Sequence, residues 1–417
     1  MTRSDAALAL LAALLAAPAA RARDLAPDGA LALRTTLKST LVVSRFPEDP
    51  ILFPDPVGSD ALFRLRLDVL AKPSESVTAE VAWETRLHAT APPAAATLGF
   101  LPADTAPPFR IRALDEPLAR AEGLSWRHEL DRAAVAWRSG PAELTFGRQA
   151  IGWGRGVLFG AVDLFAPFSP LEADRAWRRG VDAARAEVRL GERASIDAAA
   201  AFGQEADPDA SIYAARVRGY AGEVDAELLL GRRARDLVVG AATSAAVGDA
   251  EAHAEAALFR TPAANPDPLF GDDRLVAKAV VGASYRFALG NGVPVWVEYH
   301  YSGFGAARPG EQLALFAEPA FAARLARGDT QITDRHAVAL LATYEANEEA
   351  TFQLLWLVSP RDGSGVLSPS ATLSLGDRAT VQATAYVPHG TAPRDGALRS
   401  DHGATPLAVL VQVAVYD

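Results

Sequence analysis

The sequence predicts an all-β fold: a transmembrane, antiparallel up-and-down β-barrel of about 18 strands, with 16 as the alternative. Stretches in which every second residue is apolar recur from Leu31 to Tyr416. After the N-terminal leader, no stretch is long and apolar enough for a membrane-spanning helix. Lipid offers backbone groups no hydrogen-bond partner, so a membrane-spanning sheet must close on itself. Its strands then alternate lipid-facing apolar side chains with lumen-facing polar ones.

The N-terminus predicts a cleaved secretory signal peptide. Arg3 precedes an apolar run over residues 6–17, and Ala20-Arg21-Ala22 provides a small-residue cleavage site. The apolar run is about a dozen residues long, short of the ~20 that a spanning helix needs. We therefore expect residues 1–22 to be removed and residues 23–417 to form a single barrel domain.

The composition excludes several classes of protein. The chain contains no cysteine, so disulfides, a lipid-modified N-terminal cysteine and Cys-ligated haem or metal are unavailable. Its formal net charge of −10 argues against nucleic acid as a partner. Half of the residues are apolar, but one repeated pattern without linkers favours a single barrel over several soluble domains. The sequence predicts no cofactor and no metal site.

The strands are predicted one by one from the alternation. In residues 61–71, for example, Phe63 and Leu65 alternate with Arg64 and Arg66, so the two faces of the strand meet different surroundings. Eighteen segments follow this pattern: 31–45, 61–71, 77–90, 124–138, 142–149, 180–190, 194–202, 211–220, 223–231, 236–246, 250–260, 274–287, 293–303, 334–345, 350–359, 366–375, 379–387 and 405–416. Two of them, 142–149 and 366–375, are weak, which leaves sixteen strands as the alternative.

The connections between these segments predict an orientation. Every second connection is a tight turn rich in Gly, Pro, Asn and Asp, such as Ser139-Gly140-Pro141 or Gly376-Asp377. The others are mostly long: 46–60, 91–123, 150–179, 203–210, 261–273, 304–333 and 388–404, with shorter ones at 232–235 and 360–365. Bacterial barrels place short turns on the periplasmic side and long loops outside. We therefore expect an outer-membrane location with both termini in the periplasm.

The most distinctive stretch spans residues 147–183. It contains Arg148-Gln149, Trp153-Gly154, Asp163-Leu164-Phe165-Ala166-Pro167, Ser169-Pro170 and Arg178-Arg179-Gly180-Val181-Asp182-Ala183. This succession resembles uncharacterised porin-like outer-membrane β-barrel proteins of Gram-negative bacteria, and the rest of the chain agrees with that group in barrel pattern only. The resemblance implies a passive or partner-associated pore, with no established substrate.

Residues 150–179 are expected to fold inward and narrow the lumen, by analogy with the third long loop of general porins. The expected constriction charges are Arg148, Arg155, Asp163, Asp174, Arg175, Arg178, Arg179 and Asp182. Acidic and basic groups opposed across a lumen would set charge selectivity. The alternative is that these charges pair with one another and brace the loop against the wall.

No catalytic residue is predicted. The seven histidines lie on separate strands and loops without metal-ligand spacing, and no Gly-x-Ser-x-Gly elbow occurs. The run Gly152-x-Gly154-x-Gly156 lacks the Lys-Ser/Thr of a phosphate-binding loop, so a glycine hinge is the simpler interpretation. A barrel hydrolase is a minor alternative, which would require the fold to bring a Ser or Asp and a His together.

The sequence thus favours an outer-membrane channel through which small polar or charged solutes diffuse, with membrane lipid around it. The alternative is a barrel that sheathes a periplasmic or surface protein partner, such as an electron carrier or a polysaccharide-export complex. No oligomeric state is predicted.

Overall fold

The computed structural model describes residues 23–24, 26, 30–92, 100–101, 107–263 and 269–416. The predicted signal peptide, residues 1–22, lies outside this described part. Among the described residues, no helix has both the length and the apolar character needed to cross a membrane.

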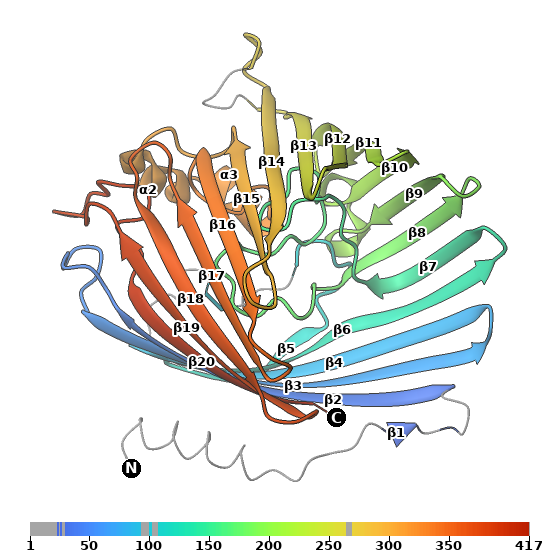
Figure 1. Cartoon of the computed structure of the whole chain (residues 1–417), viewed down its shortest axis with the longest axis horizontal. Coiled ribbons are helices and arrows are strands. Elements are labelled where there is room, and N and C mark those ends of the chain that lie inside the picture. The colour runs from blue at the N-terminus through green and yellow to red at the C-terminus, as the bar shows by residue number, and fades with distance from the viewer. Residues whose placement is uncertain are drawn as a thin grey trace.

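Within the described residues, eighteen strands close into one antiparallel barrel (Figure 1). They are β2 (Leu31–Arg45), β3 (Val57–Ser74), β4 (Val77–Ala91), β6 (Leu124–Ser139), β7 (Ala142–Gln149), β8 (Val181–Arg189), β9 (Ala194–Ala201), β10 (Ile212–Ala221), β11 (Val224–Arg233), β12 (Asp236–Val247), β13 (Ala250–Arg260), β14 (Leu275–Phe287), β15 (Val293–Ser302), β16 (His336–Glu345), β17 (Ala350–Val358), β18 (Gly365–Ser374), β19 (Ala379–His389) and β20 (Leu407–Tyr416). Each strand pairs with the next one along the chain, and β20 pairs with β2 to close the barrel. The predicted count of eighteen is confirmed, and the two weak segments are β7 and β18.

The remaining elements lie in loops of the barrel. A two-residue strand, β1 (Arg23–Asp24), pairs with β2, and β5 (Asp115–Ala121) forms a hairpin with β6. Two helices, α2 (Pro309–Ala317) and α3 (Pro319–Arg327), follow β15, and two short 3₁₀ turns, η1 (Gln204–Ala206) and η2 (Pro208–Ala210), follow β9. The sequence prediction left 91–123 and 304–333 as loops, and it therefore missed β5, α2 and α3.

The alternation along the strands separates an apolar outside from a charged inside. On β11, Leu228 and Leu230 are 69 and 66% exposed, whereas Glu227, which precedes them, is 3% exposed. Successive side chains of a strand point to opposite faces of the sheet, so the leucines face outward and Glu227 faces the lumen. The barrel therefore has its apolar surface on the outside.

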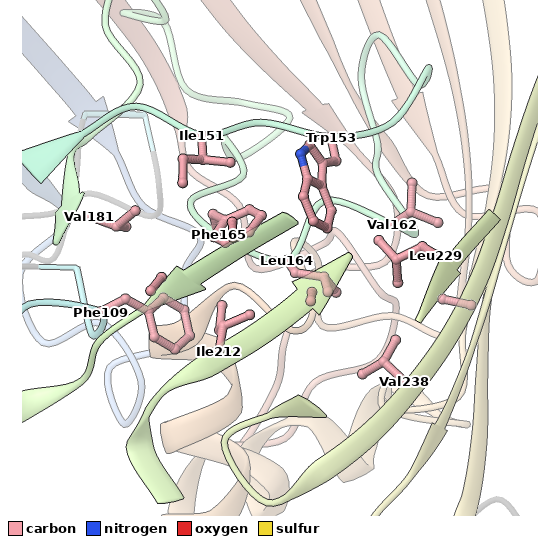
Figure 2. Close-up of a cluster of buried hydrophobic side chains, with 14 of the residues drawn as sticks. Phe109, Ile151, Trp153, Val162, Leu164, Phe165, Val181, Ile212, Leu229 and Val238 are labelled. Carbon is pink, nitrogen blue, oxygen red and sulfur yellow. The ribbon is translucent and has the colours of Figure 1, made fainter. Parts of the chain in front are cut away.

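The lumen is not empty, because the connection between β7 and β8 passes through it (Figure 1). Figure 2 shows its apolar residues packed against the inner wall: Ile151, Trp153 and Phe165 lie among side chains of the strands. The rings of Trp153 and Phe165 meet edge to face, with their centroids 5.0 Å apart. From the wall, Ile212, Leu229 and Val238 complete this cluster. The interior of the barrel thus contains a packed core.

Candidate functional site

Residues 150–180 form the candidate site, because they cross the lumen and contact the wall on several sides. The first half of this inward segment lies against β13, β14 and β15. The second half lies against β2, β3 and β6. Each half is held by a different kind of contact.

Two glutamates of the wall hold the first half through its backbone. Glu255 on β13 accepts four backbone N–H groups from the segment, and Glu298 on β15 accepts three. The donors are Arg155, Gly156 (2.7 Å), Ala161 (2.7 Å) and Val162 (3.3 Å) to Glu255, and Val157 (2.6 Å), Leu158 (3.0 Å) and Phe159 (3.0 Å) to Glu298. A loop inside a barrel has no strand ladder to satisfy its backbone donors, and hydrogen bonds to carboxylates are the strong kind. The carboxylates of Glu255 and Glu298 therefore accept the backbone hydrogen bonds that a neighbouring strand would otherwise accept.

The glycines of the segment allow this close approach. A Cβ on Gly154 would lie 2.6 Å from Glu255 Oε1, and one on Gly156 would lie 1.9 Å from the carbonyl oxygen of Phe159. Gly154 also has a φ of +108°, which side chains disfavour. The glycines serve a tight turn against a carboxylate, and the N–H groups of Arg155 and Gly156 are bonded to Glu255.

Neighbouring wall residues complete the support of this half. Lys278 Nζ donates to the carbonyl oxygen of Gly160 (3.0 Å), and His253 Nε2 lies 2.9 Å from Glu298 Oε1. The ring of His300 stacks on Phe159, with the centroids 4.8 Å apart and the planes 13° apart. All of these groups are buried.

Trp177 anchors the second half against the opposite wall. Its ring lies 4.1 Å from Lys38 Nζ, and the guanidinium carbons of Arg64 and Arg66 lie 5.2 and 5.0 Å from its centroid. Such cation–π contacts strengthen when they are desolvated. Asp174 accepts hydrogen bonds from Lys38 Nζ and Arg64 Nη1, both at 2.7 Å.

These contacts belong to a larger network of ion pairs. It links seven cations with six carboxylates: Lys38, Arg64, Arg66, Arg86, Arg110, Arg132 and Arg179 with Asp68, Glu80, Glu84, Glu129, Asp131 and Asp174. Removing one partner from a buried pair is strongly destabilising because it leaves a charge uncompensated. The inward segment and this side of the wall therefore stabilise each other.

Six of the eight expected constriction charges lie in the lumen, and each contacts a partner. Asp174 joins the network through Lys38 and Arg64, and Arg179 joins it through Glu129. Arg178 pairs with Asp163, Arg155 Nη2 lies 2.5 Å from Asp225 Oδ2 on β11, and Arg175 donates to the carbonyl oxygens of Ser169 (2.9 Å) and Pro170 (2.5 Å). This arrangement favours the bracing alternative for most of these charges.

The other two, Arg148 and Asp182, correct the expectation. Asp182 alternates on β8 with the lumen-packed Val181 and Ala183, and Arg148 faces Asp182 from β7, so both lie on the outward side. Arg148 Nε donates to Asp182 Oδ1 (2.7 Å), and the pair is covered by residues 110–114. These two charges help to complete the wall and do not narrow the lumen.

Two cavities lie on either side of the inward segment. The larger measures about 890 Å³ and is bounded mainly by the long loops and by α2 and α3. The smaller measures about 390 Å³ and is lined by Arg175, Arg178 and residues 152–160. Pro167, Phe168 and Gln331 line both. Gln331 also bridges the segment, accepting from Gly160 N (2.9 Å) and donating to the carbonyl oxygen of Phe168 (3.1 Å).

Sequence reasoning missed the wall partners of the segment. Lys38, Glu255, Glu298 and Trp177 were not among the expected site residues. In the sequence, Lys38, Glu255 and Glu298 could be recognised only as charged residues at inward positions of strands. Many other charged residues occupy such positions too. Pairing them with the segment requires the closed barrel, since Glu255 and Gly156 are 99 residues apart in the chain.

The structure was compared with the requirements of a metal site and of a Ser–His pair. No group of three or more His, Cys, Asp or Glu side chains there could hold a metal ion. His402 Nε2 lies 3.1 Å from Asp334 Oδ2. The adjacent Ser364 Oγ accepts the backbone N–H of His402 (3.0 Å) and donates to Asp362 (2.6 Å), so its hydroxyl is directed away from the imidazole.

Comparison with known proteins yields structural matches only. The sequence matches no protein-family model and no curated protein. The fold is similar to that of OccAB1 from Acinetobacter baumannii, with a TM-score of 0.55 and 9% identity over 95% of this chain and 97% of that chain. OccAB4 from the same organism gives a TM-score of 0.53 and 8% identity over 92% of this chain and 96% of that chain. A triple mutant of Rhodopseudomonas blastica porin aligns with a TM-score of 0.44 and 10% identity over 93% of this chain and all of that chain. At such low identity, the Acinetobacter matches show a shared barrel fold.

Proposed function

We propose that this chain is a porin-like channel of the bacterial outer membrane through which small polar or charged solutes diffuse. The observation that carries the proposal is the inward segment, which crosses the lumen and is held by Glu255 and Glu298 on one side and by Lys38 and Arg64 on the other. A barrel narrowed by one of its own loops restricts what passes without blocking diffusion through the remaining space. The barrel fold shared with the Acinetobacter proteins is consistent with this role.

The outer surface supports the membrane location. Large apolar side chains are exposed on the outside of many strands, among them Val43, Val81, Leu228, Val281 and Val409. In water this surface would be costly, whereas hydrocarbon accepts it. We place the short turns and both termini on the periplasmic side, since the long loops of bacterial barrels face outward.

The two cavities share Pro167, Phe168 and Gln331 in their linings, and we place the constriction of the route there. Arg155, Asp174 and Arg179 of the segment are paired with the wall. We therefore attribute selectivity to the groups that line the smaller cavity, in which Arg175 and Arg178 are the cations and Asp163 and Glu255 the carboxylates.

Single-channel recording in planar bilayers tests this function. Purified, folded protein should give stepwise currents, and deletion of residues 152–176 should leave the barrel folded but increase the conductance. A deletion of residues 204–209, which lie in the β9–β10 loop, is the matched control and should leave the conductance near that of the wild type. Folded protein without any stepwise current would contradict the proposal. Unchanged conductance and ion selectivity after the 152–176 deletion would show that the segment does not restrict the lumen.

A barrel that sheathes a protein partner is the alternative. In the described part of the chain, residues 150–180 occupy the lumen, and α2 and α3 border the larger cavity. A partner would therefore have only the rim of the barrel to bind. This geometry favours the channel.

A further inference from the structure

The wall of the barrel has a gap that an irregular segment closes. β7 has only 8 residues and β8 has 9, beside 16 in β6. β7 pairs with residues 133–139 of β6 and then leaves the wall at Gln149 to enter the lumen. The first half of β6 is therefore without β7 as a neighbour. β5 pairs with residues 124–129 of β6, and residues 109–114 bridge the space that remains.

Separate contacts, and not a strand ladder, hold this bridging segment in place. Its carbonyl oxygens accept backbone N–H groups from three neighbours: Asp182 to Phe109 (2.9 Å), Leu130 to Leu114 (3.0 Å) and Glu205 to Ile111 (3.0 Å). The outward pair Arg148–Asp182 adds side-chain bonds to it, for example from Arg148 Nη2 to the carbonyl oxygen of Arg112 (2.6 Å). At the other junctions of the described wall, each strand pairs directly with its neighbour over most of its length. This stretch can therefore move without unpairing two strands.

The larger cavity reaches the residues that directly precede this stretch. Pro107 and Pro108 belong to its lining, and twenty of its thirty-five lining residues are apolar. Its volume of about 890 Å³ lies within the roughly 300–1,000 Å³ typical of small-molecule sites. Charged lining groups are already paired, such as Arg86 with Glu84 and Glu129. The surface left for a ligand is therefore mainly apolar.

A second apolar pocket lies on the outer side of the same stretch. It measures about 320 Å³, and Ile111, Leu114, Leu130 and Phe146 are among its lining residues. Phe146 is 58% exposed and pairs in register with the equally outward Val135, which places this pocket on the outer surface of the barrel. Along this part of the chain, the buried Phe109 and Arg110 lie between Pro108 of the larger cavity and Ile111 of the outer pocket.

We propose that the larger cavity binds an uncharged apolar molecule, aliphatic or aromatic, and that the molecule leaves sideways through the wall at residues 107–114 into the surrounding hydrocarbon. The inference rests on the proposed outer-membrane location but not on conduction through the lumen. The free energy of an apolar molecule rises in a narrow passage lined by ions and water and falls when the molecule enters lipid. The sideways route joins two mainly apolar pockets and avoids the charged passage at Arg175 and Arg178. The charged side chain that it passes, Arg110, is held by Glu129 and Asp131.

Engineered disulfides across the gap test the route. The chain contains no cysteine, so a pair of introduced cysteines forms a single defined bridge. The pair I111C/E205C joins the bridging segment to the β9–β10 loop, and L114C/L130C joins it to β6. In each pair the two backbones are hydrogen-bonded, which brings the Cα atoms near the 4.4–6.8 Å usual for disulfides. The pair E116C/H128C joins register partners within the β5–β6 hairpin and leaves the gap free, so it is the matched control.

The readout is the entry of N-phenyl-1-naphthylamine, an uncharged aromatic probe that fluoresces in hydrocarbon, into intact cells expressing each variant. We expect wild-type protein to raise the rate of entry several-fold over cells without it. Oxidation of either gap pair should return the rate to that background, reduction should restore it, and the control pair should respond to neither. Rates for both oxidised gap pairs equal to wild type, or wild-type rates equal to background, would overturn the proposal.

A cavity variant and a conductance measurement separate this inference from the channel function. Leu325→Arg places a charge among the lining residues of the larger cavity and should slow entry of the probe without any disulfide. Oxidised I111C/E205C should retain wild-type conductance for salt. Disulfide-sensitive probe entry without any conductance would contradict the channel function and support the sideways route. Conductance together with disulfide-insensitive probe entry would support the channel function and contradict the sideways route.

Discussion

Glu255 illustrates how single residues hold the lumen in its narrowed state, because its carboxylate accepts four backbone N–H groups of the inward segment. Each buried donor left without a partner costs about 1–3 kcal/mol. We therefore expect Glu255→Ala to release this part of the segment and to give larger, noisier single-channel currents than wild type. Glu251 faces the same side of β13 but is exposed, so Glu251→Ala is the control and should leave the currents unchanged. Identical currents from both variants would show that the segment is held without the carboxylate.

The same residue shows why the site was only partly predictable. Residues 150–179 stood out in the sequence because the strand alternation lapses there while charge and glycine accumulate. Their partners on the wall have no comparable signal in the sequence, since an inward-facing glutamate on a strand cannot be distinguished from any other lumen-facing residue. Arg148 and Asp182 were misassigned because the face to which they belong depends on where β7 and β8 end.

At the level of elements, a cluster around Asp401 and His402 connects the loops on the rim, and we expect the stability of this cluster to depend on pH. Asp401 accepts from Gln312 on α2 (3.2 Å) and from Ser359 (2.6 Å), and His402 lies 3.1 Å from Asp334. Burial lowers the pKa of His402, but its hydrogen bond to Asp334 and the charges of Asp334, Asp401 and Asp362 outweigh this, so the pKa is raised above its ordinary value of about 6.5. Burial and the neighbouring Asp334 raise the pKa of Asp401 as well.

A raised pKa means that the folded cluster binds protons more strongly than the open loops do, so its stability falls as pH rises through that pKa. The contribution of His402 is fully present below about pH 6.5 and is lost at higher pH. Hydrogen exchange at the backbone of Asp401 and His402, corrected for intrinsic rates, should be more strongly protected at pH 5.5 than at pH 8.5. His402→Gln should remove this difference, whereas His389→Gln on β19 should keep it. Equal protection at both pH values in the wild type would contradict the assignment.

The strands and the loop elements differ in how well they could be predicted. A membrane-spanning strand can be recognised in the sequence because one face meets lipid and the other meets the lumen, so apolar and polar residues alternate. This alternation was sufficient even for the short β7 and β18. β5 lacks that signal, because its residues after Asp115 are exposed along its whole length. The helices α2 and α3 each begin at a proline, and Gly328 in the left-handed conformation ends α3. Those signals were present in the sequence, but they fell in a segment assigned to a loop.

For the molecule as a whole, the alternation of short turns and long loops predicts which end of the barrel faces the medium. The parity of eighteen strands puts every long connection at one end, together with the shorter β11–β12 and β17–β18 connections, and puts the other short turns at the opposite end, where β20 ends. Phe270 in the β13–β14 loop is 88% exposed, and Leu289 in the β14–β15 turn is 63% exposed. Both residues can be replaced by cysteine in a chain that has none.

A membrane-impermeant maleimide added to intact cells should therefore label Phe270→Cys and leave Leu289→Cys unlabelled, because only the long loops are expected to face outward. After the outer membrane is permeabilised, the two variants should be labelled to similar extents, since both side chains are exposed at their own end of the barrel. Labelling of the permeabilised sample measures the local accessibility of each cysteine. Any difference between the two variants in intact cells therefore reports the side of the membrane on which each cysteine lies. Labelling of Leu289→Cys alone in intact cells would reverse the orientation and place the larger cavity, with its apolar lining, on the periplasmic side.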